Sequence, residues 1–287
     1  MRVRLRWQKR KEAEPVDCQL ERFRKVLLAA LETEWYRPVL EKAGIGARAE
    51  VDSLRSISEA LPRFPPLDLA DYRESLAQFL NPRAPEPEPQ RLRCFFEPAP
   101  KIAVLLPGFE QSAGVRVFAS DWTRKLEKFH AEVIAAPLEV LRHLARSIQE
   151  GRVAVPPLTH AVVPFTGIQE GLITEQDREL FWRAFQVPVY EQFLGFDGRL
   201  VAWECEAHEG LHVEAENAFL ETHCRNGNEE LLLTSLTDLR HPALRLATGF
   251  QGLIIGGECG CGSKTRRLAD VQRVSSAQRQ AAACFAD

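Results

Sequence analysis

A tight β-hairpin is predicted at residues 203–216, WECEAHEGLHVEAE, and it restricts how this part of the chain can fold. Apolar and polar residues alternate on both sides of a glycine-containing turn, a pattern typical of two paired strands. If His208 and Glu209 form the tip, Cys205 and His212 are cross-strand partners on one face, with Cβ atoms about 5 Å apart. The pattern therefore places a thiol and an imidazole side by side.

A second stretch, ECGCG at residues 258–262, carries two further cysteines on a glycine-flanked loop. Three thiolates and one imidazole suit a tetrahedral zinc site. His208 is an alternative fourth ligand. The spacing is not that of a standard zinc finger, so the alternative to a metal site is a set of ordinary reduced cysteines and a histidine in two turns. The candidate ligands are Cys205, His212, Cys259 and Cys261.

Length and composition are those of an ordinary globular chain of one large domain or two, with 287 residues, 45% apolar and 27% charged. A net charge of −3 gives no reason to expect nucleic acid or a membrane surface as a partner. Seven cysteines, an odd number, favour a reducing compartment over a disulfide framework. Without a membrane-spanning apolar run or a signal peptide, we expect a cytoplasmic protein.

The first third of the chain divides into a basic segment at residues 1–17 and a helical region at 18–90 that ends in a proline-rich loop. Apolar residues at intervals of three and four predict helices over 18–43, from Ser53 to Leu61, and over 68–79 with an acidic cap. The run NPRAPEPEPQ has no packing face and predicts an exposed loop or a boundary.

Residues 91–199 alternate between strand and helix patterns, which predicts an α/β core with a right-handed parallel β-α-β-α-β layer. The run PGFEQSAG predicts a hairpin between its first two strands. Thr174 and Asp177 resemble a capping box. Strands are expected at 101–106, 115–119, 132–136, 159–165 and 187–193, and helices at 122–130, 138–149 and 174–185.

The remainder, residues 200–268, reads as β-rich. It holds the candidate metal hairpin and two strands, 218–224 and 230–235, around the turn RNGN. Residues 269–287 have a polar, alanine-rich composition that predicts a tail.

Several runs in this order resemble phenylacetate-CoA ligases and their capsule-synthesis relatives, which are adenylate-forming, AMP-binding enzymes: ECEAHEGLHVEAENAFLE, NEELLLTSLTDLRHPALRLATG and CGCG. The upstream runs WYRPVLEKAGI, AEVIAAPLEVLRHLA and FTGIQEGLITEQDRELFWRAFQVPVYEQF agree in order and spacing. The resemblance covers about residues 20–268 and implies an adenylate-forming large domain: N-terminal helices, a parallel α/β layer and C-terminal β-hairpins. Some relatives carry zinc on a similar Cys/His set, which implies a structural zinc ion here.

Adenylation needs groups for the phosphates, Mg²⁺ and ribose, and this chain departs from the family at each. The family's phosphate loop ends in Gly-Lys, whereas residues 96–118 offer only Gly108, Ser112 and Gly114. The family's Mg²⁺-binding glutamate has only Asp197 as a possible remnant, in a stretch that reads more simply as a turn.

The family's ribose-binding aspartate follows Arg-Tyr-Arg-Thr-Gly. This chain reads LRLATGF, which keeps Arg245, Thr248 and Gly249 as a remnant nucleotide motif but has Phe250 in place of the acid. After residues 265–268 the run SSAQRQAAACFAD does not resemble the family's small C-terminal domain, so we expect no counterpart of its catalytic lysine.

These departures predict a degenerate relative, a pseudoenzyme with the scaffold and the zinc site but not the adenylation machinery. We expect a binding or scaffold protein whose partner is an active ligase or another biosynthetic enzyme, and we do not expect ATP or Mg²⁺ as cofactors. The alternative is an active acyl-activating ligase completed by a separate lysine-bearing domain.

Overall fold

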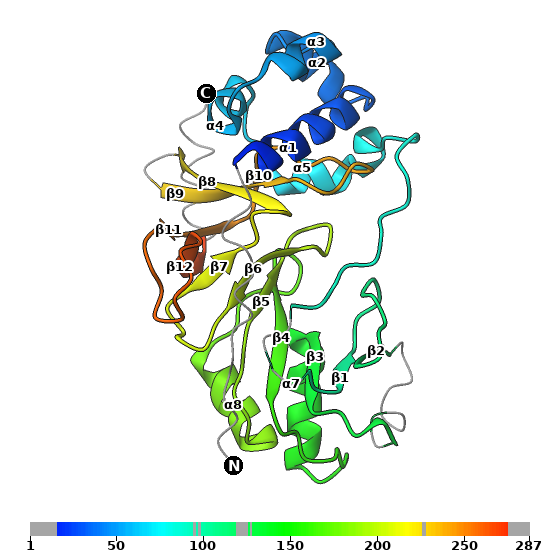
Figure 1. Ribbon diagram of the computed structural model, residues 1–287, viewed down its shortest axis with the longest axis vertical. Coiled ribbons are helices and arrows are strands. Elements are labelled where there is room, and N and C mark those ends of the chain that lie inside the picture. Colours follow the sequence, from blue (N-terminus) through cyan, green and yellow to red (C-terminus); the bar gives the residue numbers. More distant parts are fainter. Residues whose placement is uncertain are drawn as a thin grey trace. The chain divides into compact units, whose positions relative to one another are not determined.

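A computed structural model of the chain describes residues 16–93, 96, 99–118, 126, 128–225 and 228–274 (Figure 1). Residues 1–15 of the expected basic segment, most of the expected helix at 122–130 and the end of the expected tail lie outside the described residues. The chain forms two compact units. One contains Glu88–Leu211, and the other combines Ala13–Pro87 with His212–Asp287.

The unit at Glu88–Leu211 is built on strands in the order β6-β5-β4-β3-β1-β2. β3, β4 and β5 are mutually parallel, which confirms the expected β-α-β-α-β layer. β4 is buried along its whole length, as expected for a strand covered on both faces. The strands are β1 (Ile102–Val104), β2 (Val115–Val117), β3 (Val133–Pro137), β4 (Ala161–Gly167), β5 (Gln192–Leu194) and β6 (Leu200–Glu204).

Two helices connect these parallel strands, and both were predicted within a residue. α7 (Leu138–Gln149) buries Leu138, Leu141 and Leu144 in the core of the unit. α8 (Glu175–Phe185) begins with the predicted capping box: the Thr174 hydroxyl accepts a hydrogen bond from the Asp177 N–H, and the Asp177 carboxylate accepts one from the Thr174 N–H. Local sequence therefore specifies these helix boundaries.

The hairpin predicted between the first two strands is wrong, because β1 and β2 are parallel, with Ile102 opposite Val115. The connection between these strands pairs with Gln90 of an upstream segment. The Gln90 N–H donates to the Gly108 carbonyl and the Gln90 carbonyl accepts from the Glu110 N–H, both at 2.8 Å. The connection thus pairs with an upstream segment and crosses back to begin β2 in the same direction as β1.

The second unit contains the N-terminal helices and the later strands. Its helices are α1 (Val16–Leu31), α2 (Tyr36–Lys42), α3 (Arg48–Ser53), α4 (Ile57–Ala60), η1 (Leu61–Arg63), α5 (Leu69–Glu74) and η2 (Leu76–Phe79). Its strands are β7 (Leu211–Val213, which begins at the boundary), β8 (Ala218–Arg225), β9 (Asn228–Ser235), β10 (Leu246–Ala247), β11 (Phe250–Ile255) and β12 (Arg267–Arg273). They run in the orders β11-β12-β7 and β10-β9-β8.

The helix predicted over residues 18–43 is interrupted between α1 and α2. Buried Thr33 donates its hydroxyl to the Ala30 carbonyl and accepts the Tyr36 N–H, so its side chain ends one helix and begins the next. The single helix expected from Ser53 is also interrupted. α3 ends at Ser53, and the two short helices α4 and η1 follow it. The acidic cap on the third helix is confirmed: Asp68 accepts the Ala70 N–H at 2.7 Å.

The stretch expected to begin a polar tail at residue 269 is partly strand. β12 runs to Arg273 and pairs antiparallel with β11, and its Leu268 is buried. Among the helices of the described residues, none has the length and apolar character needed to cross a membrane.

The Asp177 carboxylate joins α8 to α7, so replacing it tests how much this contact stabilises the unit. Arg142 of α7 donates to it from Nε and Nη2 at 2.7 and 2.6 Å. Burial opposes ionisation of Asp177, but the hydrogen bonds from Arg142 and Thr174 outweigh burial and hold its pKa below the usual 3.8. Its stabilising contribution is therefore present above that pH and is lost as the pH falls through the folded-state pKa.

We expect Asp177→Ala to lower the free energy of unfolding by about 2 kcal/mol at pH 7, from the lost cap and ion pair. The difference from wild type should shrink near pH 3, as measured by urea unfolding. Glu179→Ala on the same helix removes only an exposed pair with Arg183 and should cost about 0.5 kcal/mol or less. An Asp177→Ala penalty that is independent of pH would contradict this assignment.

Candidate metal centre

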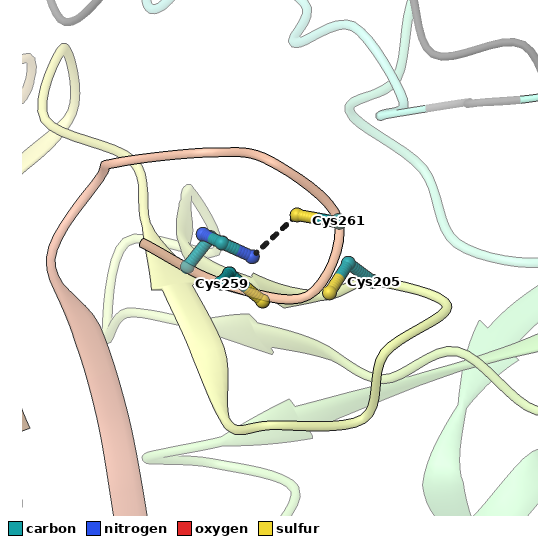
Figure 2. A group of neighbouring side chains, drawn as sticks. Cys205, Cys259 and Cys261 are labelled. Atoms are coloured by element: carbon teal, nitrogen blue, oxygen red, sulfur yellow. Dashed lines mark hydrogen bonds between the residues drawn. The ribbon is translucent and has the colours of Figure 1, made fainter. Parts of the chain in front are cut away.

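Four side chains from separate segments converge in the structure, and they are the predicted Cys/His set (Figure 2). Their ligand atoms all lie within 4.8 Å of one another. Cys205 directly follows β6, and His212 lies in β7. Cys259 and Cys261 lie on the loop between β11 and β12. Cys205 and His212 are fully buried, Cys259 is 3% exposed, and Cys261 is half-buried.

The His212 imidazole presents one nitrogen to the sulfur atoms and the other to a hydroxyl. Nε2 lies 3.4 Å from the Cys261 Sγ, and Nδ1 lies 2.7 Å from the Thr265 Oγ1. If Nδ1–H donates to Thr265, the lone pair of Nε2 faces the cysteines. A histidine that binds a metal through one nitrogen usually donates its other N–H in this way.

The loop that carries two of the cysteines is closed by its own hydrogen bonds. The Cys259 N–H donates to the Ser263 carbonyl at 2.9 Å, and the Gly262 N–H donates to the Cys259 carbonyl at 2.7 Å. Gly262 has φ +84°, a conformation that favours glycine. This tight turn places the side chains of Cys259 and Cys261 on the same side as His212.

The donor set fits a metal ion of the zinc type. In a tetrahedral site with Zn–S bonds of about 2.3 Å, neighbouring sulfur atoms lie roughly 3.8 Å apart, so an ion needs only a small contraction of the cluster. Thiolate and imidazole donors favour zinc over the hard cations Mg²⁺ and Ca²⁺. Four protein ligands leave no open position for substrate, which is the arrangement of a structural site.

His208, the alternative ligand, does not join this cluster. Its Nδ1 lies 2.7 Å from the Glu204 Oε1, and its ring stacks on Tyr190 with centroids 5.6 Å apart. The connection between β6 and β7 is also wider than the predicted two-residue tip. It spans residues 205–210 and begins with a turn in which the His208 N–H donates to the Cys205 carbonyl.

Arg245, predicted as part of the remnant nucleotide motif, makes its contacts within the protein. Its Nε donates to the Glu221 Oε1 at 2.5 Å and its Nη1 to the Phe64 carbonyl at 2.6 Å. The Arg245 side chain is 9% exposed. It therefore joins the N-terminal helical segment to the β8 strand of the same unit.

Thr248 and Gly249 of the same motif also bond to the protein. The Thr248 hydroxyl donates to the Leu231 carbonyl at 2.8 Å and accepts the Phe250 N–H, and the Gly249 N–H donates to the Glu230 carboxylate. Phe250 is 1% exposed, and the Arg273 guanidinium lies 5.3 Å from its ring centroid.

The other remnant residues lie in turns. The Asp197 carboxylate accepts the Arg199 N–H at 3.0 Å, in the local arrangement expected of an acidic turn residue. In the connection from β1 to β2, the Ser112 N–H donates to the Val115 carbonyl, and the Gly108 carbonyl accepts from Gln90. Main-chain hydrogen bonds therefore determine the conformation of the connection that corresponds to the family's phosphate loop.

A buried carboxylate network next to Cys205 was not predicted from the sequence. Arg178 of α8 donates to both Glu204 oxygens at 3.0 Å and lies 3.8 Å from Glu191. Burial, and then the charge of Glu204, raises the pKa of Glu191 to about 7, although the Thr166 hydroxyl donates to it. The available signal was an acidic residue inside each of two apolar strand patterns, at residues 191 and 204.

The sequence matches no protein-family profile and no curated protein. Solved structures do match. A 2-hydroxyisobutyryl-CoA ligase in an open conformation, in complex with 2-HIB-AMP and CoA, has a TM-score of 0.68 and 15% identity over 92% of this chain and 72% of its own. The same ligase in its postadenylation state, in complex with R3-HIB-AMP, has a TM-score of 0.65 and 15% identity over 90% of this chain and 67% of its own. This chain has an adenylate-forming ligase fold.

The adenylate-forming ligase fold confirms the predicted fold class, including the α/β layer and the N-terminal helices. At 15% identity the likeness shows the fold alone. The closer resemblance to phenylacetate-CoA ligases remains a prediction from the sequence runs.

We expect the purified protein to contain about one zinc ion per chain, and Cys205→Ser to lose most of it, because the variant removes one of four ligands. Elemental analysis after dialysis measures the stoichiometry. Cys224→Ser is the matched control, since Cys224 is exposed and outside the cluster. Little zinc in the wild type, unchanged by Cys205→Ser, would rule out the site.

Thr265→Val should weaken zinc binding by about tenfold while leaving the stoichiometry unchanged, because it removes the oxygen that orients His212. Competition with a chromogenic chelator measures the affinity. With Co²⁺ as a probe, the sulfur-to-metal charge-transfer band should persist in Thr265→Val and decrease in Cys205→Ser. Thr222→Val, at an exposed position of β8, should change neither quantity.

Proposed function

We propose that this protein is a catalytically degenerate relative of adenylate-forming ligases that works as a binding or scaffold protein, with a structural zinc ion on its Cys/His cluster. The observation that carries the proposal is the buried Phe250 at the position where the family's ribose-binding aspartate stands. A phenyl ring accepts no ordinary hydrogen bond from ribose hydroxyls.

The residues that still match the nucleotide motif support this proposal. Arg245 and Thr248 direct their polar atoms to carbonyl and carboxylate groups of their own unit. Binding a nucleotide through them would first break buried hydrogen bonds, and an unpaired buried polar group costs about 1–3 kcal/mol. Loss of one group that stabilises transition-state charge typically lowers the rate by about 10²–10³. This chain differs from the family at the phosphate-, Mg²⁺- and ribose-binding positions.

The second candidate is an active acyl-activating ligase whose site is completed by a lysine-bearing domain on another chain. The fold likeness to 2-hydroxyisobutyryl-CoA ligase in complex with 2-HIB-AMP and CoA favours this candidate. Phe250 and the main-chain pairing of residues 108–115 oppose it, because both positions would have to contact the nucleotide. We therefore place the non-catalytic function first.

A scaffold role needs a partner, and we propose an active ligase or another biosynthetic enzyme. The zinc ion in this proposal stabilises the β6–β7 connection and the loop before β12 without taking part in chemistry. A closed four-ligand site contributes directly to folding free energy.

We expect no heat of binding with ATP·Mg²⁺ and no carboxylate-dependent exchange of pyrophosphate into ATP, over a panel of aromatic and fatty acids. Phe250→Asp should not create either activity. It should lower the free energy of unfolding by about 3 kcal/mol or more, because it buries a carboxylate in an apolar position.

Leu253→Asp is the matched control on the same strand, β11. Leu253 is 50% exposed, so an acid there should cost about 1 kcal/mol or less. Measurable exchange in the wild type would establish the second candidate. A gain of ATP binding in Phe250→Asp would show that a nucleotide pocket survives and would contradict the degenerate assignment.

A further inference from the structure

A pocket of about 670 Å³ lies within the unit that combines Ala13–Pro87 with His212–Asp287. Its lining comes from α1, α2, the start of α3, the segment after η2 and the loop after β9. It includes no residue of the Cys/His cluster or of the remnant nucleotide motif. The volume lies within the usual range for small-molecule pockets, so the pocket can hold a small organic ligand.

Part of the lining is apolar. Leu28 and Leu31 of α1 and Leu239 of the loop after β9 are half-buried, and Ala29 is buried. These side chains offer a surface on which a hydrophobic group can be removed from water. The pocket thus favours a ligand with an apolar or aromatic body.

A nearly buried amide in the lining has a donor that the protein leaves unused. Asn81 is 6% exposed, and its Oδ1 accepts the Arg83 N–H at 3.0 Å. Because a main-chain N–H only donates, this bond identifies the other side-chain atom, Nδ2, as the NH₂ group. Nδ2 has no hydrogen-bond partner in the part of the chain that the structure describes, and it is not sealed from solvent. Its N–H groups are therefore available to a ligand in the pocket.

Hydrogen bonds hold Asn81 in place before any ligand binds. Its N–H donates to the Arg240 carbonyl at 2.7 Å, and its carbonyl accepts the Ala84 N–H at 3.2 Å. Together with the bond at Oδ1, these contacts orient the NH₂ group in advance. A ligand acceptor that binds to it loses little conformational freedom of the protein, which favours affinity.

The charged side chains around the pocket favour an anion. Arg83 is paired with Glu32 at 2.7 Å. Arg37 and Arg48 are exposed, and neither forms an ion pair with the described residues; only the Nε of Arg37 is bound, to a main-chain carbonyl. Within the described lining, Glu41 is the carboxylate without an ion pair. Three guanidinium groups and two carboxylates leave one net positive charge.

We propose that this pocket binds an organic monoanion, a carboxylate on an apolar or aromatic body. The anion accepts a hydrogen bond from Nδ2 of Asn81 and is stabilised by the charges of Arg37 and Arg48, while its body packs against the leucines. An ammonium ligand does not fit, because it cannot accept from Nδ2 and meets a net positive charge. No residue of the nucleotide motif lines the pocket, so the anion is a bound ligand and not a substrate for adenylation. The inference therefore goes beyond the proposed function and holds for either candidate.

Three compounds that share one body and differ in charge test the proposal: 3-phenylpropanoate, 3-phenylpropan-1-ol and 3-phenylpropan-1-amine. In NMR-monitored titrations at pH 7 and low salt, the carboxylate should bind at least about tenfold more tightly than the alcohol, and the amine should not saturate. Added salt should weaken only the binding of the carboxylate. Equal affinity for the three compounds, or no binding of the carboxylate at millimolar concentration, overturns the proposal.

Variants locate the site. Asn81→Asp keeps an oxygen for the Arg83 N–H but replaces the NH₂ donor with a negative oxygen, so it should weaken binding of 3-phenylpropanoate by at least about tenfold. Arg48→Gln should weaken it by about threefold. Arg55→Gln is the matched control and should change nothing, because Arg55 is exposed and does not line the pocket.

A thermal melt checks that each variant is folded. If the buried acid of Asn81→Asp prevents folding, the double variant Arg37→Gln/Arg48→Gln carries the test, because both side chains are exposed. It should weaken binding of 3-phenylpropanoate by about tenfold. Wild-type affinity in the double variant, or in a folded Asn81→Asp protein, would show that the anion binds elsewhere and that the assignment is wrong.

Discussion

The carboxylate of Glu204 holds together the elements from which Cys205, the first residue of the Cys/His cluster, extends. It is 5% exposed, and it accepts hydrogen bonds from Arg178 of α8, from the main-chain N–H of Glu191 and from His208. A buried carboxylate without these partners would cost several kcal/mol, so the helix, the start of β5 and the end of β6 are held together. Cys205 is the next residue, and its position follows from the same contacts.

Much of the α/β unit and the four residues of the Cys/His cluster were predictable, because their signals are local. The Thr174–Asp177 capping box and the apolar spacing of α7 depend on residues within one helix. The cysteines and histidine stand in short turn and strand patterns whose geometry is nearly independent of the rest of the chain. The sequence identified which residues meet, although it predicted a hairpin tip narrower than residues 205–210.

The features that the sequence did not predict depend on long-range contacts. β1 and β2 are parallel and Gln90 pairs with their connection, whereas no pattern within residues 105–114 distinguishes this from a hairpin. The helix break at Thr33 depends on which way one hydroxyl points. The role of Glu204 depends on Arg178, which lies on a helix 26 residues earlier in the chain. Such partners are identified only when the tertiary arrangement is known.

The LRLATG run shows that residues resembling a nucleotide motif can have structural roles of their own. Arg245 bonds to Glu221 and Phe64, and Thr248 bonds to Leu231, so each stabilises the fold of its unit whether or not a nucleotide is bound. Replacing either would leave buried partners unsatisfied, a cost that acts on folding itself. An aspartate that only binds ribose would make no comparable contacts within the protein. A phenylalanine at this position, Phe250, instead fills a buried apolar site. If the chain is the degenerate relative proposed above, these energetics account for a lost ligand-binding residue beside structural neighbours that are retained.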